Sequence, residues 1–106
     1  MNNIEDLIGQ LTFDEKISML AGADLWNTVP VPRLGIPAIR VTDGPNGARG
    51  TRGSSGPTSA CFPVGTALAA TWNTELVHRV GQAMADEVRS KGSHILLAQT
   101  VNIHRF

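Results

Sequence analysis

Residues 43–56 read DGPNGARGTRGSSG and contain five glycines, one proline and no large apolar side chain. Glycine and proline disfavour the interiors of helices and strands, and this stretch offers no apolar side chain that would gain from burial. The sequence therefore predicts a loop over these residues. Regular structure is expected only in the segments before and after it.

The segments before the loop predict short elements. Ile4, Leu7 and Ile8 are spaced to share one helical face. Thr12 and Glu15 match a capping box, in which each side chain hydrogen-bonds the backbone N–H of the other residue. The predicted elements are a helix over residues 3–10, a helix over residues 12–22, a stiff proline-rich connector over residues 29–32 and a strand over residues 36–42.

The segments after the loop predict a longer helix and a second strand. The helix covers residues 74–91, with Asn73 as its N-cap and Gly92 just past its end. The apolar run over residues 94–98 is typical of a strand buried on both faces. Residues 60–71 are apolar but interrupted by proline and glycine, and predict a short strand or an irregular segment. Trp72 is expected to pack against the start of the helix, as in a hydrophobic staple.

A strand, a helix and a second apolar strand in this order are typical of a βαβ unit in a parallel sheet. A sheet of two or three strands covered by one long helix leaves its edges unpaired and one face uncovered. The sequence therefore predicts the beginning of a larger α/β domain.

Composition excludes several classes of function. The chain has nine Lys and Arg and nine Asp and Glu, so its formal net charge is zero and binding to nucleic acid or to an anionic membrane is not expected. No apolar run approaches the ~18 residues of a membrane helix. Residues 1–10 lack the basic and apolar regions of an export signal, so a cytoplasmic location is expected. Cys61 is the single cysteine and is expected to be a small buried thiol.

Asp43 is the first candidate site residue, because it lies at the carboxyl end of a predicted parallel strand, where α/β folds bind their ligands. A carboxylate there can accept hydrogen bonds from two adjacent hydroxyls, as in sugar recognition. The alternative is a turn residue whose side chain bonds its own backbone. Arg49 and Arg52, in the same loop, can bind a carboxylate, a phosphate or Asp43 itself, or can be ordinary solvated arginines.

The remaining polar residues indicate no cofactor. The glycines match neither the dinucleotide-binding pattern nor the P-loop pattern. The histidines, His78, His94 and His104, lack metal-ligand spacing. Asp86 and Glu87 are interpreted as a solvated helix face. Trp26 or Trp72 can stack on a sugar, although packing is the simpler role for Trp72.

Several stretches resemble the start of glycoside hydrolase family 3, the β-glucosidase family. They occur in the family's order and together cover residues 11–105 almost completely. The stretches are LTFDEKISMLAGADLW (11–26), LGIPAIRVTDGPNGARGTR (34–52), ACFPVGTALAATWNTELV (60–77) and KGSHILLAQTVNIHR (91–105).

The resemblance implies a fold and a site. Family members begin with a (β/α)8-like barrel, so residues 1–106 are expected to form an incomplete N-terminal portion of that barrel, with N-terminal helices, two to three parallel strands and one long helix. The family's first strand ends in an aspartate that binds hydroxyls of the terminal glucose in the −1 subsite. Here that residue is Asp43, with Arg49 as the second candidate for substrate binding.

The family's nucleophilic aspartate and acid/base glutamate occur later in its sequences, so no catalytic residue is expected here. After residues 101–105 the family pattern continues with Ser-Pro, whereas this chain has Phe106, and we expect a truncated product. The resemblance implies part of a retaining β-glucosidase whose partner is a β-glucoside or oligosaccharide, and which is inactive as this chain alone. The alternative is a non-catalytic carbohydrate- or protein-binding fragment.

Overall fold

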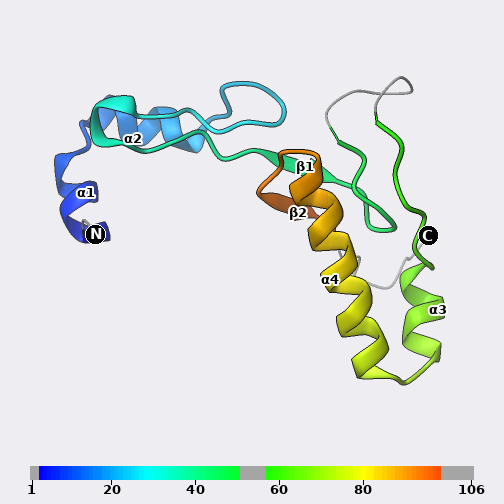
Figure 1. The fold of residues 1–106 in the computed structure, drawn as a ribbon. Coiled ribbons are helices and arrows are strands. Elements are labelled where there is room, and N and C mark those ends of the chain that lie inside the picture. Colours follow the sequence, from blue (N-terminus) through cyan, green and yellow to red (C-terminus); the bar gives the residue numbers. More distant parts are fainter. Residues whose placement is uncertain (1–2, 51–56, 99–106) are drawn as a thin grey trace, which may run out of the picture. The chain divides into compact units, whose positions relative to one another are not determined.

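The computed structural model describes residues 3–50 and 57–98, and the chain divides into two compact units, residues 1–40 and residues 41–106 (Figure 1). The first unit contains α1 (Ile4–Gln10), α2 (Phe13–Leu20) and the short 3-10 helix η1 (Pro32–Leu34). The second contains β1 (Val41–Asp43), α3 (Gly65–Ala70), α4 (Thr74–Ser90) and β2 (Ile95–Leu97).

A capping box starts α2, as the sequence predicts. The Thr12 N–H donates to Glu15 Oε2 over 2.8 Å, and the Glu15 N–H donates to Thr12 Oγ1 over 3.2 Å. These two bonds satisfy N–H groups that have no partner inside the helix. The helix ends at Leu20, before the predicted limit at Gly22, because the extended backbone of Ala21 stops it.

Arg33 ties η1 to the two helices of the first unit. Its Nε donates to Glu15 Oε1 over 2.7 Å, and its Nη2 donates to the carbonyl of Gln10 over 2.8 Å and to Glu15 Oε2. The Arg33 hydrogen bonds, assisted by the Thr12 N–H, lower the pKa of Glu15 from 4.5 to about 2. Val31 of the predicted connector, residues 29–32, is only 4% exposed.

The second unit is built on two parallel strands, as predicted. β1 and β2 pair with Val41 opposite Ile95 and Asp43 opposite Leu97. Both strands are shorter than the sequence predicts. The expectation that the second strand is buried on both faces is wrong, because Ile95 and Leu97 are 45% and 54% exposed.

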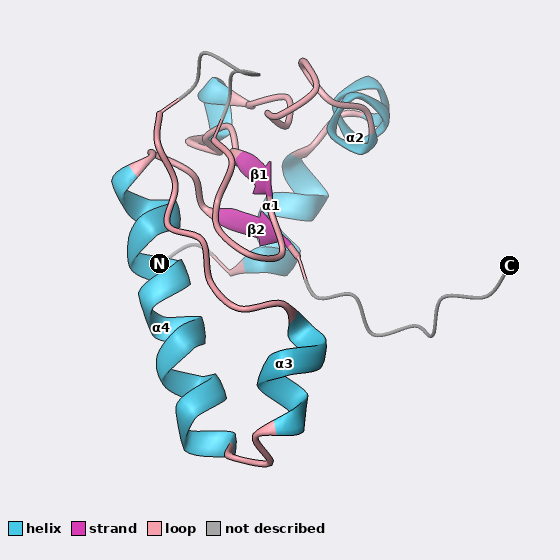
Figure 2. Ribbon diagram, turned by 90° about the vertical axis from the view of Figure 1, so that its right-hand side faces the viewer, coloured by secondary structure: helices cyan, strands magenta, loops and turns pink. Residues whose placement is uncertain are grey.

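Two helices separated by a short turn connect the strands, and they lie side by side and antiparallel in Figures 1 and 2. The predicted long helix is α4, and the Asn73 side chain caps it by accepting from the Leu76 N–H over 2.9 Å. The prediction of a strand or irregular segment over residues 60–71 is wrong in part, since α3 forms there. Trp72 has a φ of +50° and is 94% exposed, so it does not pack against the helix start.

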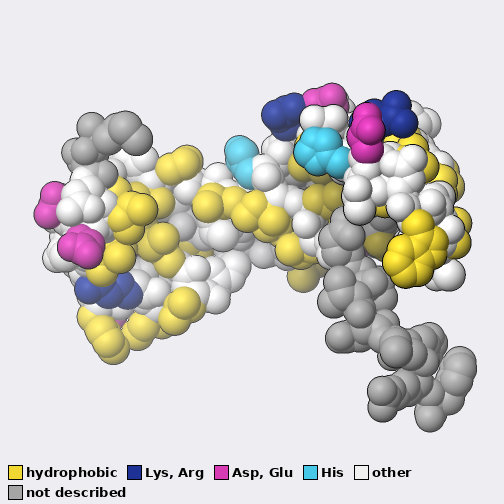
Figure 3. Space-filling view, turned by 90° about the horizontal axis from the view of Figure 1, so that it is seen from below, with side chains coloured by type: hydrophobic (Ala, Val, Ile, Leu, Met, Phe, Trp, Pro, Cys, Tyr) yellow, Lys and Arg dark blue, Asp and Glu magenta, His cyan; other side chains and the backbone are white. Residues whose placement is uncertain are grey.

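The buried apolar residues of the second unit are few. Met84 and Val88 of α4 are each 5% exposed, and Ala48 of the loop is fully buried. Cys61 is exposed, so its expected burial is also wrong. Figure 3 shows hydrophobic side chains on the surface of both units. Within the described residues, no helix is long and apolar enough to cross a membrane.

Candidate functional site

Asp43 is the last residue of β1 and lies opposite Leu97, the last residue of β2. Its Oδ1 is buried, 2.7 Å from Nε of Arg49, while the side chain as a whole is 39% exposed. The structure thus pairs the two candidate binding residues at the carboxyl end of a parallel strand pair. Such a half-exposed ion pair contributes only about 0–1 kcal/mol to stability.

The first part of the glycine-rich loop folds back on β1. The backbone N–H of Arg49 donates to the carbonyl of Asp43 over 2.9 Å, and the N–H of Gly50 donates to Oγ1 of Thr42 over 3.0 Å. Thr42 is fully buried, so its hydroxyl holds Gly50 from the interior. These bonds place Arg49 next to Asp43 through the backbone as well as through the side chains.

Two glycines in this loop are required by close backbone contacts. Gly44 has a φ of +125°, and a Cβ there would lie 2.0 Å from the carbonyl oxygen of Gly47. Gly47 has a φ of +152°, and a Cβ there would lie 1.9 Å from the carbonyl oxygen of Ala60. Any other residue at either position would have to displace backbone atoms, so the loop can follow this path only with glycine at both positions.

The end of α4 holds the loop through Glu87 and Lys91, which we call the loop anchor. Glu87 Oε2 accepts from the Ala48 N–H over 3.0 Å, and Oε1 accepts from the Ala60 N–H over 2.6 Å. Lys91 Nζ donates to the Ala48 carbonyl, to Ser59 Oγ over 2.6 Å and to Glu87 Oε1 over 3.1 Å. The interpretation of Glu87 as part of a solvated face is therefore wrong.

The loop anchor is an ion pair between residues four positions apart, and both of its side chains are largely buried. The side chains of Glu87 and Lys91 are only 13% and 7% exposed. Burial alone raises the pKa of Glu87, but the hydrogen bonds from Ala60, Lys91 and Ala48 outweigh it and leave the pKa below its ordinary value. Glu87 is thus held ionised. Sequence reasoning missed the anchor, although its one sequence signal was a carboxylate four residues before a lysine at the helix end.

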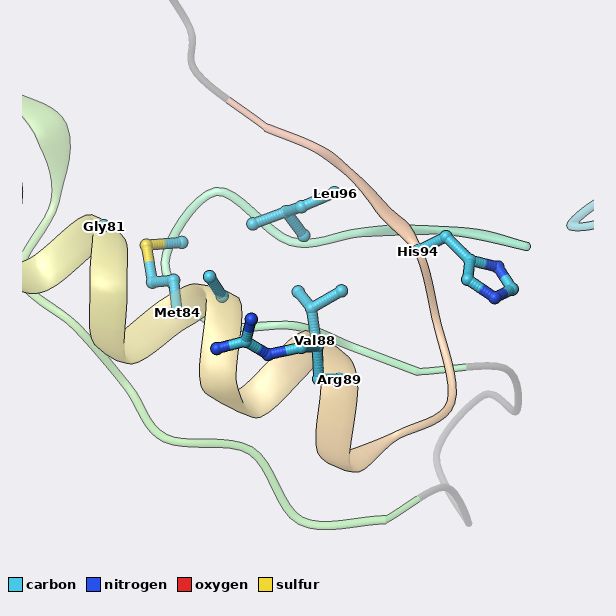
Figure 4. A pocket seen from close by; sticks show the side chains of 7 residues that line it. Gly81, Met84, Val88, Arg89, His94 and Leu96 are labelled. Carbon is cyan, nitrogen blue, oxygen red and sulfur yellow. The ribbon is translucent and has the colours of Figure 1, made fainter. Parts of the chain in front are cut away.

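A separate hollow of about 290 Å³ lies beside α4 and β2. Figure 4 shows Met84, Val88 and Leu96 on its apolar wall, while the imidazole of His94 projects away from them. None of its lining residues belongs to the Asp43 site. The remaining lining residues are Gly81, Ala85 and Arg89.

The arrangement at Asp43 is suited to recognition of a hydroxylated ligand. A carboxylate held by a guanidinium group offers acceptors and donors at fixed positions, as binding of neighbouring hydroxyls requires. Arg52 and His104 lie outside the described residues. Within the described residues, no group of three His, Cys, Asp or Glu side chains lies close enough together to hold a metal ion.

Comparison with known proteins gives relatives along nearly the whole chain. The family description "Glycosyl hydrolase family 3 N terminal domain" matches residues 7–106. The chain is 54% identical over 102 residues to a probable β-glucosidase J of Neosartorya fischeri. This alignment covers 96% of the chain and 12% of that protein. It is 55% identical over 105 residues to a β-glucosidase of Rhizobium radiobacter, covering 96% and 13% of the two chains.

Solved structures agree with these sequence matches. The crystal structure of the Kluyveromyces marxianus β-glucosidase in complex with glucose superposes with a TM-score of 0.93 at 46% identity, over 97% of this chain and 12% of that one. β-Glucosidase 3B of Thermotoga neapolitana, in complex with α-D-glucose, gives a TM-score of 0.85 at 38% identity, over 98% and 17%.

The α/β architecture and the carboxylate at the end of β1 thus occur in a segment shared with glycoside hydrolases. The chain belongs to glycosyl hydrolase family 3, as its sequence motifs predict. It spans about one eighth of the length of the curated relatives described above.

Proposed function

We propose that this chain supplies one wall of the sugar-binding subsite of a β-glucosidase, with Asp43 as the residue that binds glucose hydroxyls. The observation that carries the proposal is the position of Asp43, at the carboxyl end of β1 and oriented by Arg49 over 2.7 Å. The solved relatives that contain glucose support a glucoside as the ligand. In this proposal β1 and β2 are the first strands of a (β/α)8-like barrel.

The reaction proposed for the whole protein is hydrolysis with retention of configuration. Such enzymes use two carboxyl groups about 5–5.5 Å apart, one as nucleophile and one as acid/base. Asp43 acts in neither role: it binds the sugar hydroxyls, and these bonds strengthen as the ring distorts toward the transition state. The 106-residue chain by itself is therefore expected to be inactive.

The test uses a chimera in which residues 1–106 replace the matching segment of the Kluyveromyces marxianus β-glucosidase. Charge-assisted hydrogen bonds contribute roughly 1.5–3 kcal/mol each. Loss of two such bonds in Asp43→Ala is expected to lower kcat/KM for an aryl β-glucoside by about two to four orders of magnitude. Asp43→Asn keeps the shape but removes the charge, so it is expected to lose nearly as much.

The turn interpretation of Asp43 predicts a different result. Asparagine is a good residue for an Asx turn, so under that interpretation Asp43→Asn keeps both the fold and the rate. Asp86→Asn is the matched control, because Asp86 is a 72% exposed carboxylate on α4 that pairs with Arg89. A folded Asp43→Asn chimera with the kcat/KM of the control would refute the proposed role of Asp43.

A further inference from the structure

The loop anchor holds one residue of the glycine-rich loop by both of its backbone polar groups. Glu87 accepts from the N–H of Ala48, and Lys91 donates to the carbonyl of the same residue. Ala48 is fully buried and directly precedes Arg49. The N–H belongs to the peptide between Gly47 and Ala48, and the carbonyl belongs to the peptide between Ala48 and Arg49. Neither peptide can rotate or shift along the helix without breaking a bond to a buried charge.

The same two side chains also bind Ser59 and Ala60, which follow the glycine-rich loop. Glu87 accepts from the Ala60 N–H over 2.6 Å, and Lys91 donates to Ser59 Oγ over 2.6 Å. Ser59 Oγ in turn donates to the Ala48 carbonyl over 2.5 Å. Ala48 in the loop and residues 59–60 after it are therefore joined through one ion pair at the end of α4.

We propose that Glu87 and Lys91 are positioning residues for sugar binding, which act through Ala48 to hold Arg49 against Asp43. The proposal rests on the proposed function of Asp43. Thr42 holds the loop at Gly50 and the anchor holds it at Ala48, so Arg49 is fixed from both sides. Its Nε then lies 2.7 Å from Asp43 Oδ1 and sets the direction of the carboxylate.

The experiment measures kcat/KM and melting temperature in the chimera described above. In Glu87→Gln the side-chain NH2 group faces a backbone N–H, so one of the two backbone donors loses its acceptor. Lys91→Met keeps the apolar stem but removes the donor to Ala48 and Ser59. Because a misplacement of about 1 Å can cost about a hundredfold in rate, each variant is expected to lose about ten- to a hundredfold in kcat/KM.

A double-mutant cycle separates positioning from simple stabilisation. If the anchor acts through Asp43, Glu87→Gln is expected to lower kcat/KM by no more than about twofold once Asp43→Asn is present. If the two residues act independently, Glu87→Gln should lower kcat/KM by the same factor in both backgrounds, to within about twofold. Asp86→Asn is again the control and is expected to stay within about twofold of the parent chimera. Lys91→Met provides the same cycle if Glu87→Gln does not fold.

The outcomes distinguish this inference from the proposed function. A full additive loss in the cycle, or unchanged kcat/KM in both anchor variants, overturns the positioning role and leaves Asp43 as the sugar ligand. A fully active Asp43→Asn chimera overturns the site itself, and the positioning role with it. Strong losses in both anchor variants that vanish in the Asp43→Asn background are the expected result.

Discussion

At the scale of single residues, two carboxylates with lowered pKa values, Glu15 and Glu87, have different environments. Glu15 lies in an exposed capping box and has its pKa lowered to about 2, chiefly by Arg33. Glu87 is mostly buried, and hydrogen bonds to two backbone N–H groups and to Lys91 keep its pKa below the ordinary value. The first environment orders a helix start, whereas the second orders a loop.

The Glu15 environment predicts a pH dependence for the first unit. Because the folded pKa is about 2 and the ordinary value is 4.5, the stabilisation is complete above about pH 4.5 and is lost as the pH falls through about 2. The measurement is the difference in melting temperature between the chimera and its Glu15→Gln variant, which is expected to shrink as the pH falls below about 4.5. In the Arg33→Gln background this pH dependence should weaken, and an unchanged pH dependence there would contradict the assigned cause.

At the scale of elements, the glycine-rich loop and α4 form one structural unit. The loop follows its path because glycine permits close backbone contacts at Gly44 and Gly47, and α4 provides the buried ion pair that holds it. Helix α4 itself is defined by local signals, the Asn73 cap and an apolar stripe that ends in the buried Met84 and Val88.

Two glycine substitutions are expected to have opposite effects in the chimera. Gly47→Ala places a methyl group against the carbonyl of Ala60, and the strained backbone alone costs about 1–3 kcal/mol, so both melting temperature and kcat/KM should fall. Gly81→Ala lies within α4, where a Cβ meets nothing within 4 Å, and should stabilise the helix by about 0.5–1 kcal/mol. Equal melting temperatures for the two variants would mean that the loop path is not as tight as described.

The elements also show what could and could not be predicted from the sequence. The capping box depends on residues three positions apart, so a local pattern was sufficient to predict it. The pairing of Asp43 with Arg49 was one of several alternatives that the sequence left open. The contact between Glu87 and Ala48 joins positions 39 residues apart and uses a backbone N–H, which no side-chain pattern encodes. The expected burial of Cys61 and Trp72 failed because apolarity does not specify a packing partner.

At the scale of the whole molecule, large apolar side chains remain exposed in each unit. Phe13, Leu20 and Leu25 in the first unit are 77%, 90% and 88% exposed, and Trp72 in the second is 94% exposed. Scattered exposed apolar residues are ordinary, but several large ones in a short chain favour dye binding and self-association.

The 106-residue chain is therefore expected to bind a hydrophobic dye such as ANS while retaining helical circular dichroism, and to melt without a sharp transition. The comparison protein is the chimera, in which dye binding should be much weaker. A monomeric chain that melts cooperatively and binds no dye would show that the exposed side chains are tolerated in solution.

The backbone is held at Gly50 and again at Ser59, and this determines where the chain can accept an inserted peptide. Gly50 is bonded to Thr42 and Ser59 is bonded to Lys91, so the chain on either side of residues 51–58 is secured independently of that segment. A peptide inserted between Gly50 and Ser59 is therefore expected to leave the positions of Asp43 and Arg49 unchanged.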